Sequence, residues 1–451
     1  MDRKIAALFV VSFVVFMAPF VMRQFYYGID EIVGTPTFYH TRIAENILEG
    51  KYYDELSFGG RPMTYPPLFP LFHAAFALIL GLNLGGMVFV SLSGALGTCT
   101  AYAFSRKYFR EDLFALFLVL MPGIIFLNSH ISTRAPPIAL GILSLYLMSE
   151  KRYLHSGISL GIAFLFHPES AGIMLIVVLA YVLSDRGIRI KDILKFAVPV
   201  ILVFFAWYAP FLAQNGLPQP NSLHEEYRDR RYSLESPAAE NFLWELGKGY
   251  FTLPLLALSA VGLLYSRNNF MRFWFIFGIA LALTAERMFF YMLFPAAFTA
   301  VFGLVKVRSS VSRNFCRMLV VFLVVYMAWF GFSRAVALAQ DYPVRQQIDA
   351  FHWLRDNTPP GAVVLSDWQW GHWISGIAGR KNFVDGYAEY APDVNTRILE
   401  LHDFYSTCRV PEGYGISYIY MEDWFAERYG ISCLSGLDAV YDNAGIKVYK
   451  V

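Results

Sequence analysis

The sequence predicts a mainly α-helical bundle that crosses a membrane many times, followed by a small C-terminal α/β domain. Of the 451 residues, 56% are hydrophobic and only 16% are charged, whereas a soluble protein carries about a quarter charged residues. Lysine and arginine recur in alternate short loops, as in polytopic membrane proteins. After about residue 341 the composition changes to polar turns, tryptophan and charge, which indicates a separate domain. The net charge of +2 gives no reason to expect a nucleic-acid partner.

About eleven hydrophobic segments are expected to form the helices of the bundle. A spanning helix needs about 20 apolar residues, and fewer where other protein surrounds it. The first segment directly follows Arg3 and Lys4, and we expect it to stay in the chain rather than be cleaved as a signal peptide. The predicted segments are 5–23, 86–104, 113–128, 136–149, 154–167, 170–184, 193–212, 249–265, 270–285, 287–305 and 317–335.

The charges in the short loops predict the orientation, because lysine and arginine gather on the cytoplasmic side. The N-terminus is therefore expected in the cytoplasm and the C-terminal domain outside it. This alternation requires that Pro66–Leu82, which begins with prolines, lies along the interface or re-enters instead of spanning. The basic loops contain Arg106, Lys107 and Arg110; Lys151 and Arg152; Arg186, Arg189, Lys191 and Lys195; Arg267 and Arg272; and Lys306, Arg308, Arg313 and Arg317.

Two regions follow from this topology. Residues 1–340 form the transmembrane domain, with external loops at 24–85, which includes interfacial helices, and at 213–248. Residues 341–451 form the extracytoplasmic α/β domain. There, Val344–Asn357 places Ile348, Phe351 and Leu354 on one helical face, and strands are expected at 362–365, 418–420 and 447–451. Cys408 and Cys433 also fall in this domain, either as a disulfide or as two buried thiols.

Arg287, at the mouth of a hydrophobic segment, is the most informative single residue. A charge at that depth costs roughly 3 kcal/mol unless it has a partner or a ligand. A guanidinium group offers a planar fork of donors to phosphate, so Arg287 is expected to bind the phosphate of a lipid; an ion pair with an acid is the alternative. Arg134, which also adjoins an apolar helix, and Arg42 are further candidates for binding such a donor.

Acids and histidines are expected on the same outer face. Asp30, Glu31, His40 and Glu235 are the catalytic candidates, acting as a base or orienting an acceptor. Asp30, Glu31 and His40, with Glu169 in second place, are also candidate ligands for a divalent ion such as Mg²⁺ or Mn²⁺. Each residue also has an interpretation without a role in a site. Asp30 and Glu31 would be solvated charges, and His40 an interfacial histidine. Glu235 would belong to a polar loop, and Glu169 would cap the next helix.

Several stretches, in this order along nearly the whole chain, resemble the GT-C membrane glycosyltransferases, and most of all the archaeal relatives of the oligosaccharyltransferase catalytic subunit. The resemblance implies a sugar donor linked to polyprenyl (dolichyl) phosphate and a lipid, glycan or protein acceptor, in the last case protein glycosylation, at the outer membrane face. It also implies that Arg287 contacts the lipid-linked phosphate and that Glu235 lies in a mobile loop. The stretches are Tyr39-His40-Thr41-Arg42-Ile43-Ala44-Glu45, Gly59-Gly60-Arg61-Pro62, Tyr65-Pro66-Pro67, Thr133-Arg134-Ala135-Pro136, Ser233-Leu234-Glu235-Ser236-Pro237, Glu286-Arg287, Trp353-Leu354-Arg355-Asp356-Asn357-Thr358-Pro359, Ser366-Asp367-Trp368-Gln369-Trp370-Gly371-His372-Trp373-Ile374, Gly379-Arg380 and Val384-Asp385.

The chain departs from the family pattern at its acidic positions. The segment Asp367-Trp368-Gln369-Trp370-Gly371 resembles the acceptor motif Trp-Trp-Asp-Tyr-Gly but has Gln369 where the aspartate would stand. Thr35-Pro36-Thr37 and Ala135-Pro136-Pro137-Ile138 stand where the family has acids and contain none, and Asp30-Glu31, upstream of the first position, would substitute there if the loop bends. A relative without catalytic activity, serving as an accessory or lipid-glycan-binding protein, is therefore the alternative. A transporter is disfavoured because the polar residues gather on one face and no internal repeat is seen.

Overall fold

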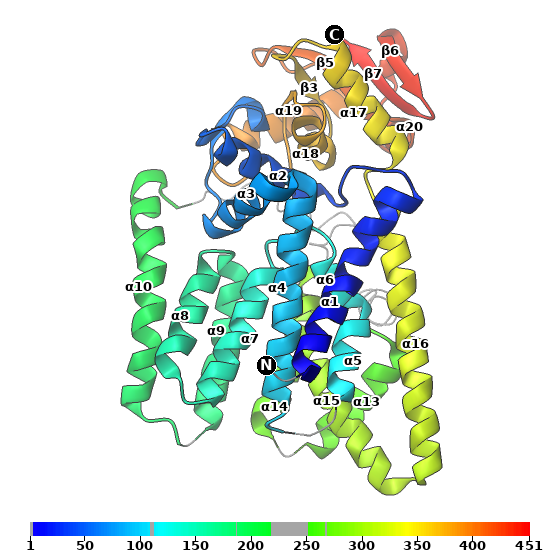
Figure 1. The fold of residues 1–451 in the computed structure, drawn as a ribbon. Coiled ribbons are helices and arrows are strands. Elements are labelled where there is room, and N and C mark those ends of the chain that lie inside the picture. The colour runs from blue at the N-terminus through cyan, green and yellow to red at the C-terminus, as the bar shows by residue number, and fades with distance from the viewer. Residues whose placement is uncertain (1–2, 109–111, 186, 218–250, 267) are drawn as a thin grey trace.

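The computed structural model of the chain describes residues 3–108, 112–185, 187–217, 251–266 and 268–451. A helical bundle carries the C-terminal domain at one end, and α1 and α16 run side by side along one flank (Figure 1). The helices of the bundle are α1 (Arg3–Val21) with the π-helical turn η1 (Met22–Tyr26), α4 (Leu82–Ser105), α5 (Leu113–Leu120), α6 (Pro122–Asn128), α7 (Ala135–Ser149), α8 (Tyr153–Phe164), α9 (Pro168–Ser184), α10 (Ile190–Asn215), α13 (Leu253–Tyr265), α14 (Asn269–Ala282), the 3₁₀ turn η4 (Glu286–Phe289), α15 (Phe290–Ser310) and α16 (Arg313–Ala339).

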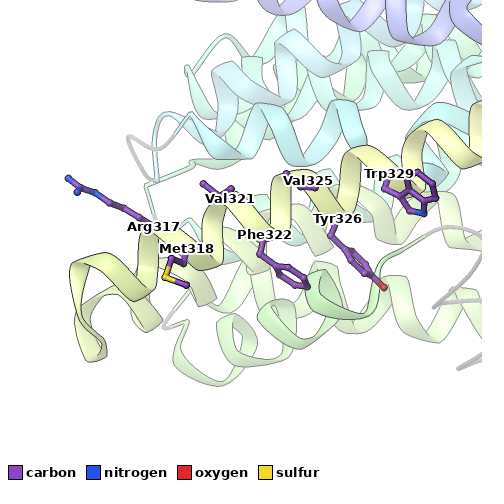
Figure 2. A pocket seen from close by; sticks show the side chains of 7 residues that line it. All are labelled: Arg317, Met318, Val321, Phe322, Val325, Tyr326 and Trp329. Atoms are coloured by element: carbon purple, nitrogen blue, oxygen red, sulfur yellow. The ribbon is translucent and has the colours of Figure 1, made fainter.

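Five of the described helices are long and apolar enough to cross a membrane by length and composition. They differ in burial. In Arg287–Ser310, 89% of the apolar membrane-crossing stretch is buried, whereas in Arg313–Ala339 only 22% of the corresponding stretch is buried. Helix α16 (Arg313–Ala339) therefore turns much of its surface away from the bundle. An apolar groove on that surface is lined by Met318, Phe322 and Trp329 (Figure 2). These side chains are apolar and belong to a helix long enough to cross a membrane, so this face is suited to contact with lipid.

One predicted helix, 113–128, is in fact two. The chain breaks between α5 and α6 at Met121, which has the extended conformation φ −70°, ψ 122°. The cause is Pro122, because the proline ring disfavours the helical conformation in the residue before it. The single-helix prediction for this segment was therefore wrong, although each of the remaining predicted segments overlaps a described helix.

The first loop packs at the end of the bundle that carries the C-terminal domain (Figure 1). It consists of α2 (Thr35–Leu48), a short hairpin of β1 (Tyr53–Asp54) and β2 (Arg61–Pro62), and α3 (Leu68–Leu80). Helix α3 has 13 residues and is not among the helices long enough to cross a membrane. The hairpin was not predicted, because its strands are too short to show a period.

The C-terminal domain contains a five-stranded mixed sheet with the order β4-β3-β5-β7-β6. The central strands β3 and β5 are parallel, and β7 runs antiparallel to both β5 and β6. The predicted helix over 344–357 and the three predicted strands are present. Cys408 is disulfide-bonded, whereas Cys99 and Cys316 are free. The elements are α17 (Arg345–Asn357), β3 (Val363–Leu365), α18 (Trp368–Gly376), β4 (Lys381–Asn382), α19 (Val394–Thr407), β5 (Ile416–Glu422), α20 (Asp423–Tyr429), η5 (Cys433–Gly436), β6 (Asp438–Asn443) and β7 (Ile446–Lys450).

Arg23 joins the first helix to the segment that leads into the C-terminal domain. Its side chain is 1% exposed and donates only to backbone carbonyls. Nε donates to Glu31 O at 2.5 Å, Nη1 to Ala339 O at 3.2 Å and Asp341 O at 2.8 Å, and Nη2 to Pro343 O at 2.5 Å. Because a guanidinium has five donors in a fixed fork, one side chain holds two chain segments together here. This contact fixes where the domain meets the bundle.

Candidate functional site

Glu169 lies between Arg134 and Arg287 and forms an ion pair with each. Its Oε2 is 3.7 Å from Arg134 Nη2, and its Oε1 is 3.4 Å from Arg287 Nη2. The three residues come from separate parts of the chain: Arg134 precedes α7, Glu169 is in the first turn of α9, and Arg287 is in η4 before α15. The structure therefore brings together three of the predicted site residues. Two guanidinium groups therefore share one carboxylate.

Local sequence explains why Glu169 is fixed in this position. Pro168 starts α9, and His167 caps it by accepting a hydrogen bond from Ser170 N to Nδ1 at 3.2 Å. The Ser170 hydroxyl is 2.7 Å from the hydroxyl of Tyr291 in α15, which ties the starts of the two helices together. Carboxylates are stabilised in the first turn of a helix by the helix dipole. Because His167 supplies the N-terminal cap of α9, the carboxylate of Glu169 is not needed for that role and pairs with the arginines.

A wall of rings borders the arginine pair. The rings of His40 and Tyr65 lie 4.7 Å apart, and those of Tyr65 and His167 lie 6.5 Å apart. Tyr65 donates to Thr133 Oγ1 at 2.7 Å, immediately before Arg134 in the chain. The first loop and the bundle are thus joined at the site.

The C-terminal domain contributes Tyr387 to the same wall. Its hydroxyl is 3.0 Å from His40 Nε2, and its ring stacks on Tyr39 with centroids 4.1 Å apart. Burial lowers the pKa of His40 well below its usual value, and the neighbouring histidines and Arg134 add to this effect. Burial raises the pKa of Tyr387, so its hydroxyl keeps its proton at neutral pH. A neutral imidazole therefore meets a neutral phenol beside the arginines, with His40 Nδ1 buried and without a hydrogen-bond partner.

Asp385 holds Tyr387 in place from within the domain. Its side chain is fully buried, accepts from Ser57 Oγ at 2.6 Å and from Tyr387 N at 2.9 Å, and lies 3.6 Å from His372 Nδ1 and 3.8 Å from Arg61 Nη2. Burial alone raises the pKa of Asp385, but His372, Arg61 and the hydrogen bonds outweigh it and lower that pKa below its usual value. Through Ser57 and Arg61, the carboxylate of Asp385 links the first loop to the C-terminal domain.

Asp30 and Glu31 lie elsewhere in the first loop. Glu31 Oε1 is 2.8 Å from His352 Nε2 in α17, and Asp30 is exposed. In the part of the chain that the structure describes, no hydrogen bond or ion pair joins either acid to His40, and no group of three or more His, Cys, Asp or Glu residues is arranged to hold a metal. The loop is fixed on the link between α16 and α17, where Gly34 N donates to Tyr342 O at 2.9 Å.

Other predicted site residues have local structural partners. Arg42 pairs with Asp54 at 3.0 Å and with Glu45 at 3.6 Å, all within the first loop. Asp367 is fully buried and caps α18 by accepting from Gln369 N at 3.2 Å, and it also accepts from Tyr405 Oη at 2.9 Å. Glu235 lies outside the described residues.

The rest of the tryptophan-rich segment packs within the domain. Trp370 is buried against Phe425 with ring centroids 5.0 Å apart, while Trp368 and Gln369 are partly exposed beside the cap. A Cβ at Gly371 would lie 2.1 Å from Val384 O, so only glycine allows α18 to pack against the segment that carries Asp385. Sequence reasoning did not identify Tyr65, Thr133, Asp385 or Tyr387 as site residues; the motif Val384-Asp385 was the only signal for the last two.

Comparisons with known proteins agree with this fold. The sequence model described as "EpsG family" matches residues 8–343. The oligosaccharyltransferase of Archaeoglobus fulgidus in complex with Zn and sulfate is similar at 15% identity and a TM-score of 0.69, covering 96% of this chain and 69% of that one. The archaeal oligosaccharyltransferase AglB from A. fulgidus, solved with an inhibitory peptide and a dolichol-phosphate, has 13% identity, a TM-score of 0.65 and coverages of 96% and 71%.

One further structure is similar to this chain over nearly its whole length. ArnT from Cupriavidus metallidurans, bound to undecaprenyl phosphate, has 15% identity and a TM-score of 0.65, covering 100% of this chain and 98% of that one. No curated protein sequence matches the chain. At such low identities the structural likeness establishes the fold alone, which is the polytopic GT-C fold with a C-terminal domain. The resemblance seen in the sequence is confirmed at this level.

Proposed function

The chain belongs to the EpsG family, and from this and the geometry of the site we propose that it is a membrane glycosyltransferase of the GT-C type. It transfers a sugar from a donor linked to polyprenyl phosphate to an acceptor that is a lipid, a glycan or a protein. The observation that carries the proposal is the pairing of Arg134 and Arg287 through Glu169 at the mouth of a membrane bundle. Two of the similar structures contain dolichol-phosphate or undecaprenyl phosphate, which supports a donor of this class.

The donor phosphate binds at Arg134 and Arg287. Each guanidinium offers a planar set of donors that matches phosphate oxygens, and charge-assisted hydrogen bonds of this kind are among the strongest in proteins. Glu169 occupies the two guanidinium groups until the donor phosphate competes for them. The polyprenyl chain lies in the membrane, and the sugar faces the ring wall of His40, Tyr65 and Tyr387.

In the transfer step, the acceptor nucleophile bonds to the anomeric carbon of the sugar as the bond from that carbon to the phosphate oxygen breaks. The lipid phosphate leaves with the electron pair of that bond, and the two arginines stabilise its negative charge. The proton of the acceptor passes to a base, for which neutral His40 beside Tyr387 is the candidate on this wall. The proposal routes no step through a metal, although one similar structure contains zinc.

The proposal also includes the orientation expected from the loop charges. The N-terminus is cytoplasmic, and the site and the C-terminal domain face the other side of the membrane. Transfer to protein, and an archaeal origin of the chain, remain predictions of the sequence resemblance.

A catalytically inactive relative that binds the same lipid is the second candidate. Three observations favour it: Glu31 pairs with His352 and not with His40, Asp30 is exposed, and Glu169 is engaged by both arginines. Such a protein would keep the donor site without completing the transfer.

The test compares surface glycans and glycolipids by mass spectrometry in the native organism with the gene, without it, and with the gene restored as Arg287→Gln. Loss of one sugar mass, restored by the wild-type gene but not by the variant, is the expected result and names the sugar. Loss of whole glycans from asparagine would identify an oligosaccharyltransferase. Unchanged glycans in all three strains would favour the inactive relative.

A further inference from the structure

A second groove lies at the end of the bundle opposite the C-terminal domain, where α16 begins (Figure 1). Helices α5, α15 and α16 contact one another, and each contributes apolar side chains to this groove, such as Leu113, Leu304 and Val320. Arginines at positions 308, 313 and 317 line the same groove. We call it the basal groove. Its lining therefore combines an apolar surface with guanidinium groups.

Two of these arginines, Arg313 and Arg317, have no protein partner. They are one helical turn apart, which places them on the same face of α16. Both side chains are exposed, and within the part of the chain that the structure describes neither forms an ion pair or a hydrogen bond. A guanidinium offers a planar fork of donors that matches phosphate oxygens. The two side chains are therefore suited to hold a phosphate at the edge of the basal groove.

The basal groove continues along α16 into the apolar groove on its outward face, because Arg317 and Val321 line both. From Arg317, the row Val321, Val325 and Trp329 runs along the helix at four-residue intervals (Figure 2). The path from Arg317 to Trp329 is about 18 Å long, from the helical rise per residue. One leaflet of a bilayer supplies roughly 15 Å of hydrocarbon. The joined grooves therefore have a cationic end and an apolar length close to that of one leaflet.

This combination fits a phospholipid whose headgroup carries a net negative charge. The phosphate would accept hydrogen bonds from Arg313 and Arg317, and an acyl chain would lie along the apolar row. The segment 306–317, which spans the connection from α15 to α16, contains four basic residues and no acid. The positive group of a zwitterionic headgroup would therefore find no acidic partner in this segment, whereas an anionic headgroup is attracted to it.

We propose that the joined grooves are a binding site for one anionic phospholipid of the leaflet that faces away from the C-terminal domain. The inference does not depend on the proposed function. Arg287 lies before the start of α15, whereas Arg308 lies near its end, so the length of that helix separates the donor site from the basal groove.

The test titrates the detergent-solubilised full chain with phosphatidylglycerol or phosphatidylcholine of identical acyl chains and measures bound lipid by native mass spectrometry. Wild type is expected to bind one phosphatidylglycerol at least about fivefold more tightly than phosphatidylcholine. Arg313→Gln and Arg317→Gln should each weaken phosphatidylglycerol binding about fivefold, and the double variant should lose the preference. Arg152→Gln, which removes an exposed arginine that lines neither groove, is the matched control and should change neither affinity.

A second variant tests the acyl-chain part of the site. Val321→Trp places a large ring where the two grooves join and keeps both arginines. Because Val321 is 62% exposed, the ring requires no repacking of the core. This variant should lose bound phosphatidylglycerol. Leu202→Trp, at a similarly exposed apolar position on α10, is its control and should bind as wild type does.

Four results would overturn the proposal. The first is equal affinity of wild type for the two lipids, and the second is unchanged phosphatidylglycerol binding by the double variant. The third is phosphatidylglycerol lost on Arg287→Gln but kept by the double variant, which would place this lipid at the donor site. The fourth is a dimer that persists without phosphatidylglycerol and dissociates in Val321→Trp, which would assign the grooves to a second copy of the chain.

Discussion

Tyr387 of the C-terminal domain and His40 of the first loop meet with 3.0 Å between hydroxyl and Nε2. The two residues are 347 positions apart in the sequence. Both border the pair of arginines that we assign to the donor phosphate. The site is therefore assembled from the bundle, the first loop and the C-terminal domain together, and the domain is part of it rather than an addition to it.

Replacing Tyr387 by phenylalanine should lower kcat about a hundredfold, on the scale of a proton-transfer group, and leave donor affinity unchanged. The variant keeps the ring that stacks on Tyr39 but removes the hydroxyl that meets His40. Steady-state kinetics would measure kcat as a function of pH. A shift of this pH profile in Tyr387→Phe would distinguish a role in proton transfer from a structural role. Tyr390→Phe, in the same segment with its hydroxyl near Gly216 O, is the control. A wild-type kcat for Tyr387→Phe would exclude the role.

Arg287→Gln should reduce transfer by about a hundredfold or more, as when one preorganised donor to a developing anion is removed. Insertion into the membrane should persist, because glutamine is less costly than arginine at this depth. Activity in membranes and the yield of monodisperse protein are measured together. Arg272→Gln, whose side chain caps backbone carbonyls of α13, serves as the control. Transfer retained by Arg287→Gln would contradict the phosphate assignment.

Glu169→Gln should bind polyprenyl phosphate roughly fivefold more tightly, which corresponds to about 1 kcal/mol for a partly exposed ion pair. The lipid phosphate then no longer competes with a carboxylate for Arg134 and Arg287. A binding titration at low and high salt measures the effect, which should shrink as salt screens the charges. Glu150→Gln, which breaks an ion pair with Lys107, is the control. Weaker binding by Glu169→Gln would show instead that the carboxylate positions the arginines.

Asp385→Asn should lower the melting temperature at pH 7, because about 3 kcal/mol is typical for removing one partner from a buried ion pair. The folded-state pKa of Asp385 lies below its unfolded value of about 3.9. The carboxylate therefore stabilises the fold above that pH, and the stabilisation is lost as the pH falls through the folded-state pKa. The gap between variant and wild type should narrow below about pH 4. Asp349→Asn, at an exposed position, should match wild type throughout; an equal gap at every pH would argue against this account.

Gly371→Ala should destabilise the C-terminal domain by about 1–3 kcal/mol, the usual cost of overpacking. The added methyl group would meet Val384 O at 2.1 Å and displace the segment that holds Asp385. Activity and melting temperature should fall together. Gly361→Ala is the matched control, since nothing lies within 4 Å of a Cβ there. Equal melting temperatures for the two variants would mean that α18 moves freely.

The sequence was most informative where hydrophobicity and period decide the structure. The membrane helices and the helix over 344–357 could be predicted because their apolar residues recur with a helical period or fill a span. From the sequence, Arg134, Glu169 and Arg287 could be placed only on the same side of the membrane. The alternation of basic loops gives no distances between residues, so their contact could not be predicted. The break at Met121 shows how one proline overrides a hydrophobic run.

The path of the first loop could not be predicted, because long-range backbone contacts determine it. Gly34 N bonds to Tyr342 O, and Glu31 O accepts from Arg23, so the acids that precede α2 are held on the link to the C-terminal domain. Similarly, Asp367 stands in a motif that suggests recognition of an acceptor, yet its oxygens cap a helix and bond Tyr405. Tyr387 carries no pattern of its own, and only the fold reveals it.

The four carbonyl contacts of Arg23 also bear on how this protein is made. The guanidinium belongs to the first membrane helix, but three of its acceptors follow more than 300 residues later, at positions 339, 341 and 343. During synthesis, the first helix enters the bilayer long before those carbonyls leave the ribosome. The first helix can pack on α4 early, but these three contacts of Arg23 form only after translation has passed α16. Assembly of this end of the molecule is a late event, and during most of translation Arg23 must be hydrated or held by another factor.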